Sequence, residues 1–115
     1  MPLGINRTLH KTYDEAVAKG HLSTALTIAS REARINEERD DPKQTGGWLR
    51  KVTNALLLQG RYAEGSLEAE RSAEIRPDPY ERTRALFILA ANDIFACKHH
   101  QALLTIGKIE ELTRA

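Results

Sequence analysis

Cys97, His99 and His100 are the residues whose types and spacing come nearest to a reactive or metal-binding site. Thiolate and imidazole are zinc ligands, but a closed structural site needs four of them, and the sequence has no second cluster of Cys and His. A catalytic thiol at Cys97 would also need an oxyanion site and an orienting group beyond His100. We interpret Cys97 as a free thiol in a turn, beside exposed imidazoles.

The acidic residues do not form a catalytic pair either. They occur as adjacent pairs, which are Asp14–Glu15, Glu37–Glu38, Asp40–Asp41 and Glu110–Glu111. Neighbours on a helix diverge by about 100°, so these pairs are typical of solvated faces. The sequence also has no glycine-rich phosphate loop, no Gly-x-Ser-x-Gly elbow and no His-Glu-x-x-His helix. It therefore predicts no enzyme activity, no cofactor and no metal.

The composition predicts a single soluble helical domain. The 115 residues are 41% hydrophobic and 29% charged but only 5% aromatic, which favours closely packed helices. Seventeen Lys and Arg balance sixteen Asp and Glu, so the charge does not favour nucleic acid or an anionic membrane. One Cys, no signal peptide and no long apolar run indicate a cytoplasmic protein.

Apolar periodicity and turn residues predict six helices. The expected ranges are about 6–19, 22–38, 48–59, 62–76, a fifth that starts at the Asp78-Pro79 signal and runs to 96, and 100–114. Residues 37–47 are charged and contain Pro and Gly, so we predict a long loop there and a third helix that opens at Trp48. The fifth helix is apolar almost all round, which predicts cover on several sides. On the last, Ala102, Ile106 and Ile109 form one predicted stripe.

Small and aromatic residues recur at fixed spacing around Gly60, in the order Gly60, Tyr62, Gly65, Ala69 and Pro77. This stretch resembles the tetratricopeptide repeat (TPR), a stacked helix-turn-helix of about 34 residues. Residues 20–25 repeat the spacing with Leu22 in place of the aromatic residue, and residues 97–102 repeat it in degenerate form. The resemblance implies an all-α solenoid of three helix pairs in one domain, at about 6–38, 46–78 and 79–114.

The same resemblance implies a concave groove along the first helix of each pair, where a peptide or a segment of another protein would bind. Carried over by repeat position, the partner-binding residues are Arg7, His10, Asp14, Arg50, Asn54, Leu57, Leu58, Arg84, Phe87 and Ile94. Val17, Ala91 and Phe95 lie at further positions of the same surface. Arg50 and Asn54 partly resemble a clamp for a C-terminal carboxylate, although Ile88 does not continue it. The implied function is that of an adaptor or chaperone-like interaction module.

Two alternatives remain open. The chain resembles TPR-like bacterial regulators that sense peptides, although it lacks the DNA-binding domain they carry. It also ends directly after the sixth predicted helix, which leaves Leu103, Leu104 and Leu112 without obvious cover. A self-assembling protein, such as a homodimer through the C-terminal helix, is therefore the second alternative.

Overall fold

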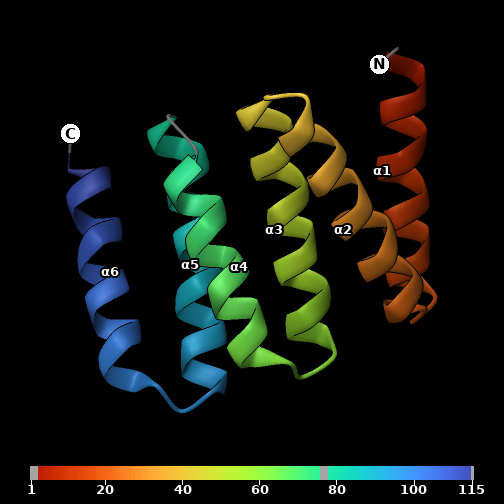
Figure 1. The fold of residues 1–115 in the computed structure, drawn as a ribbon. Coiled ribbons are helices and arrows are strands. Elements are labelled where there is room, and N and C mark those ends of the chain that lie inside the picture. The colour runs from red at the N-terminus through yellow and green to blue at the C-terminus, as the bar shows by residue number, and fades with distance from the viewer. Residues whose placement is uncertain (1–2, 76–77, 115) are drawn as a thin grey trace.

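The computed structural model describes residues 3–75 and 78–114, and these residues form six α-helices and no β-strand (Figure 1). The helices are α1 (Leu3–Ala18), α2 (Leu22–Glu38), α3 (Pro42–Leu58), α4 (Tyr62–Ile75), α5 (Pro79–Phe95) and α6 (His99–Thr113). Each helix packs antiparallel on the next, as in a solenoid. The predicted fold class is therefore confirmed. Pro77, the last residue of the TPR-like pattern, lies outside the described residues.

Four of the connections share one turn geometry. Gly20, Asp40, Gly60 and Cys97 each have a positive φ, of 77°, 57°, 76° and 62°. The residue after each of them donates its N–H to the carbonyl five residues earlier, as His21 does to Ala16 at 2.8 Å and Lys98 to Asp93 at 2.7 Å. This is the Schellman motif, which satisfies the last carbonyls of a helix. The turn inside each predicted helix pair and the turn between the first two pairs therefore share one geometry.

The predicted loop over residues 37–47 is wrong. Helix α3 begins at Pro42, because the Asp41 side chain accepts a hydrogen bond from the Gln44 N–H at 3.1 Å and Pro42 fits the first helical position. Gly46 lies inside the helix, where its carbonyl accepts a hydrogen bond from the Ser72 hydroxyl at 3.0 Å. Gly46 and Ser72 are both buried at this contact between α3 and α4. Long helices of 17 residues, α2 and α3, take up the sequence assigned to the loop.

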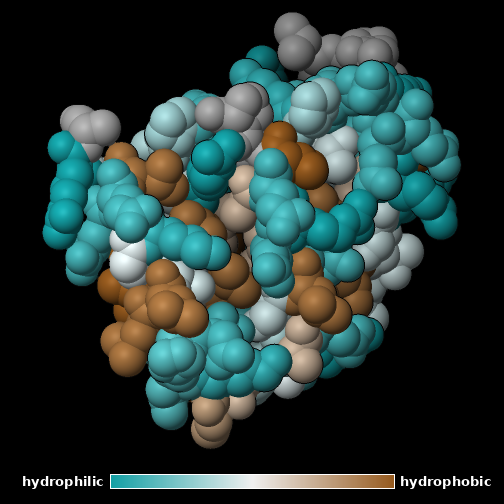
Figure 2. All heavy atoms as spheres, turned by 60° about the vertical axis from the view of Figure 1, so that its left-hand side comes forward, coloured by the Kyte–Doolittle hydropathy of each residue, from teal (hydrophilic) through white to brown (hydrophobic). Residues whose placement is uncertain are grey.

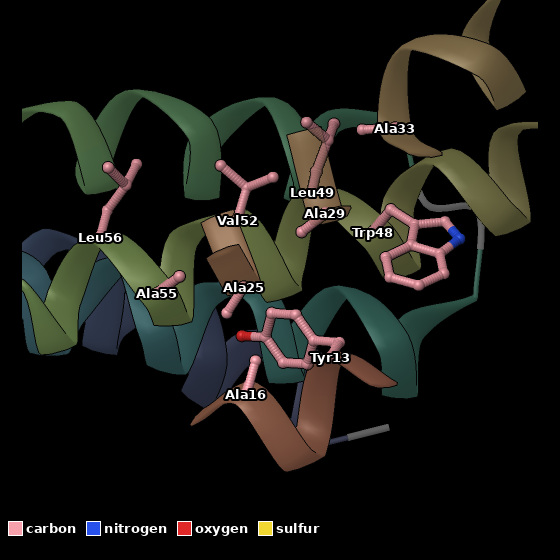
Figure 3. Packing of buried hydrophobic residues seen from close by; sticks show 10 residues of the cluster. All are labelled: Tyr13, Ala16, Ala25, Ala29, Ala33, Trp48, Leu49, Val52, Ala55 and Leu56. Carbon is pink, nitrogen blue, oxygen red and sulfur yellow. The ribbon is translucent and has the colours of Figure 1, made fainter. Parts of the chain in front are cut away.

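The six helices form two layers. The first layer consists of α1, α3 and α5, with α1 and α5 each in contact with α3. The second layer consists of α2, α4 and α6. One core cluster joins the N-terminal helices α1, α2 and α3, and the fully buried Trp48 lies at one end of it (Figure 3). A second joins α4, α5 and α6 through Ala69, Ala73, Ala85, Leu86, Leu89 and Ile109. Alanines supply much of both clusters, so the helices pack closely.

Helix α5 is covered on several sides, as predicted, because it packs against α3, α4 and α6. Its remaining side leaves Phe87, Ile94 and Phe95 exposed. One expectation for α6 needs correction. On α6, Ala102 and Ile109 are buried as predicted, but Ile106 points away and Thr105 takes its place in the interface. Leu103 and Leu104 are exposed, as expected from their lack of cover. Leu112 instead packs against the second core cluster.

None of the described helices is both long and apolar enough to cross a membrane.

Candidate protein-binding face

Helix α1 is held to α3 by aromatic and polar contacts, and two of the residues that make them, His10 and Asp14, were predicted to bind a partner. The His10 ring stacks on the Trp48 indole, with centroids 4.1 Å apart and planes 5° from parallel. The Tyr13 hydroxyl donates to the Lys51 carbonyl at 2.8 Å. The Lys51 ammonium lies 3.2 Å from the Asp14 carboxylate and 4.5 Å from the centre of the Tyr13 ring. These contacts fix the orientation of α1 against α3.

The electrostatics of this face favour a neutral imidazole. Burial lowers the pKa of His10, and the positive charges of Lys51 and Arg50 lower it further, while Asp14 opposes them. Burial raises the pKa of Tyr13, while a hydrogen bond with Asn54 lowers it by a smaller amount. These interactions place His10 and Asp14 of α1 close to Arg50 and Asn54 of α3. Four of the ten predicted residues therefore lie together on one face.

Helix α5 contributes the apolar part of the same layer. Phe87 is 59% exposed and Ile94 is 47% exposed, and Leu58 of α3 is 50% exposed. The Phe95 ring stacks on Tyr62, with centroids 5.4 Å apart. Arg84 lies above the Tyr80 ring at 5.9 Å and 3.7 Å from the Glu81 carboxylate.

The shared turn geometry relates the three helices of this layer. Gly20 and Gly60 are 40 residues apart, and Gly60 and Cys97 are 37 apart. By these offsets His10, Arg50 and Phe87 are equivalent, and so are Asp14, Asn54 and Ala91. The equivalent positions change from polar on α1 and α3 to apolar on α5. Of the remaining predicted residues, Arg7 is exposed near the start of α1 and Leu57 is half-buried on α3.

The hollows of the second layer lie elsewhere. A groove of about 530 Å³ runs between α4 and α6 over Leu86 and Leu89 of α5. A smaller one of about 260 Å³ lies between α2 and α4 over Leu49 and Val52 of α3. None of the ten predicted residues lines either groove. The sequence gives no signal for these grooves, since they arise from the spacing of helices two apart in the chain.

No reactive cluster emerges among the described residues. No three side chains of His, Cys, Asp or Glu lie close enough to hold a metal ion in this part of the chain. Cys97 is exposed in its turn. Its φ of 62° is the left-handed conformation of the residue that ends a helix.

Comparison of the chain with protein-family models, with curated proteins and with solved structures gives no match in any of the three.

Proposed function

We propose that the chain is a protein-interaction module that binds a segment of a partner protein on the face formed by α1, α3 and α5. The observation that carries the proposal is the exposure of two large apolar side chains, Phe87 and Ile94, beside the polar residues of α3. Apolar side chains left in water do not stabilise the fold. Their burial by a partner would contribute favourable free energy to binding.

The chemistry of the face suits an extended or helical peptide. Aromatic and Arg side chains dominate the binding energy of protein interfaces, and Phe87 and Arg50 supply one of each. The Asn54 amide has both donor and acceptor atoms that can pair with a peptide backbone. Apolar residues of the partner would bury Phe87 and Ile94, at about 25 cal/mol for each Å² removed from water.

The resemblance to the TPR pattern supports the same proposal, because that family binds peptides along the first helix of each pair. An adaptor or chaperone-like role follows from it. A single free thiol supports a reducing compartment such as the cytoplasm as its setting.

Site-specific photo-crosslinking tests the proposal. A benzophenone amino acid at position 87 should trap a partner in cells, and the same amino acid at position 67 should not. Leu67 is a matched control, since it is 66% exposed but lies on α4 in the second layer. The trapped protein identifies the partner by mass spectrometry.

Variants then establish which side chains bind. Phe87→Ala combined with Ile94→Ala should reduce affinity for that partner by at least about tenfold, which is about 1.4 kcal/mol, while Leu67→Ala leaves it unchanged. Retention of the partner at full affinity by the double variant, with helicity preserved, would show that this face is not the binding site.

A further inference from the structure

Helix α6 presents one exposed stripe that none of the described helices covers. It consists of His99, Leu103, Ile106 and Glu110, spaced so that all four lie on one side of the helix. We call it the α6 end face. Leu103 is 67% exposed and Ile106 is 38% exposed, and His99 and Glu110 are exposed as well. Figure 2 brings this end of the molecule forward and shows hydrophobic residues gathered among hydrophilic ones.

The equivalent positions of α4 show what such a face contacts. Across the 37-residue offset, Ser66 and Ala69 of α4 correspond to Leu103 and Ile106. The Ser66 hydroxyl donates to Asp93 of α5 at 2.7 Å, and Ala69 belongs to the core cluster shared with α5. In α4 these positions therefore pack on the following antiparallel helix. The α6 end face is shaped for a helix in the same place, and no described helix lies there.

The opposite end of the solenoid does not fit this face. The outer side of α1 carries exposed polar side chains, which are Thr8, Lys11, Thr12 and Glu15. A head-to-tail contact would press these groups against Leu103 and Ile106. Such a contact would desolvate polar groups without pairing them, so it is unfavourable. The α6 end face is better matched by a copy of itself.

The sequence of the face is self-complementary when two copies run antiparallel. With the symmetry axis between residues 104 and 105, residue 103 faces residue 106 of the other copy, and residue 99 faces residue 110. Leu103 then packs on the second copy's Ile106, while the His99 imidazole donates to the second copy's Glu110 carboxylate. Both contacts occur twice, as a closed two-fold interface requires.

We propose that two copies of this chain associate through an antiparallel, two-fold pairing of their α6 end faces. This interface lies on α6 and is separate from the partner-binding face that α1, α3 and α5 form. The chain could therefore dimerise whether or not the first proposal holds.

Sedimentation equilibrium over about 1–500 μM tests the pairing. The wild type should reach twice its 12.9 kDa mass. Leu103→Ser should weaken the dimer by at least about tenfold, because it removes both central apolar contacts. Leu67→Ser is the matched control, with nearly the same exposure on α4, and it should leave the dissociation constant unchanged. A wild type that stays monomeric at 500 μM would overturn the proposal, as would a dimer that tolerates Leu103→Ser.

A charge exchange tests the register. His99→Glu should weaken the dimer by at least about tenfold, since it places two carboxylates against each other at both ends of the interface. Adding Glu110→Lys to the same chain restores opposite charges across the axis and should recover the wild-type dissociation constant. Circular dichroism confirms that each variant is folded. Failure of the second substitution to restore the dimer would refute the antiparallel register.

Discussion

Gly65→Ala should destabilise the protein, although alanine is the better helix former. A Cβ atom added at Gly65 would lie 2.3 Å from the Asn92 Oδ1 atom and 3.0 Å from its Cγ, where ordinary contact begins at 3.4 Å. The side chain of Asn92 is fully buried, and its Nδ2 atom donates to the Ile88 carbonyl at 3.0 Å. Because the amide is enclosed and held by this hydrogen bond, we expect that it cannot turn aside freely and that α4 and α5 would have to move apart.

The magnitude follows from two opposing effects. Overpacking of a filled interface costs typically about 1–3 kcal/mol. Replacing a helical glycine by alanine returns about 1 kcal/mol. The expected net loss in the free energy of unfolding is therefore about 1 kcal/mol. Gly107→Ala is the matched control, because Gly107 lies within α6 and its added Cβ would meet no atom within 4 Å. That substitution should raise the free energy of unfolding by about 1 kcal/mol.

Urea denaturation followed by circular dichroism at low micromolar concentration measures both changes. A double-mutant cycle assigns the cause, since Asn92→Ala removes the obstructing amide. In that background Gly65→Ala should become stabilising, with a coupling of about 2 kcal/mol between the two sites. Equal stabilisation by Gly65→Ala and Gly107→Ala in the wild-type background would refute the reasoning.

Three further outcomes are expected. Cys97→Gly should raise the free energy of unfolding by about 1 kcal/mol, measured by thermal or urea unfolding. Cys97 adopts a left-handed conformation at φ 62°, which costs a non-glycine residue roughly this much. An unchanged free energy of unfolding would contradict strain in that turn. Ser66→Ala should lower the free energy of unfolding by about 1–3 kcal/mol, since it removes the hydroxyl that donates to the buried Asp93 carboxylate. Ser66→Thr tests whether a retained hydroxyl limits this loss. The pKa of His10 is lowered in the folded state, so this residue contributes stability above its unfolded pKa of 6.5, and that stability is lost as the pH falls through the lower folded value. The variant His10→Phe keeps a ring on Trp48 but cannot titrate. Its free energy of unfolding should therefore fall less than that of the wild type between pH 7 and pH 5. Parallel pH profiles of the two proteins would contradict this contribution of His10.

Local signals in the sequence were sufficient for most helix boundaries. Asp78 and Pro79 predicted the start of α5, and the Asp78 side chain does accept a hydrogen bond from the Tyr80 N–H at 2.9 Å. The same Asp-Pro signal stands at Asp41 and Pro42, but the glycines at 46 and 47 outweighed it in the prediction. Both glycines are helical, and Gly46 contacts Ser72, 26 residues away, which no local pattern reveals.

The candidate site was predictable only in part. Repeat spacing placed His10, Asp14, Arg50 and Asn54 on one face, and the structure brings them together. The stacking of His10 on Trp48 and the hydrogen bond from Tyr13 to Lys51 join residues 38 apart in the chain, so they depend on how α1 lies against α3. The outward position of Ile106 has a similar cause. The periodicity of a helix gives its apolar residues, but the neighbouring helix decides which of them are covered.

The common geometry of the four turns has a consequence for how this architecture can change in length. Gly20, Asp40 and Gly60 follow one another at intervals of 20 residues, so a helix and its turn form one unit. Loss or gain of a single unit would leave the remaining turns of this geometry intact. It would also move each later helix from one layer to the other, so that side chains selected for one face would appear on the opposite face. Only an even number of units can be removed or added without this exchange, which makes the helix pair a requirement of side-chain placement rather than of backbone folding.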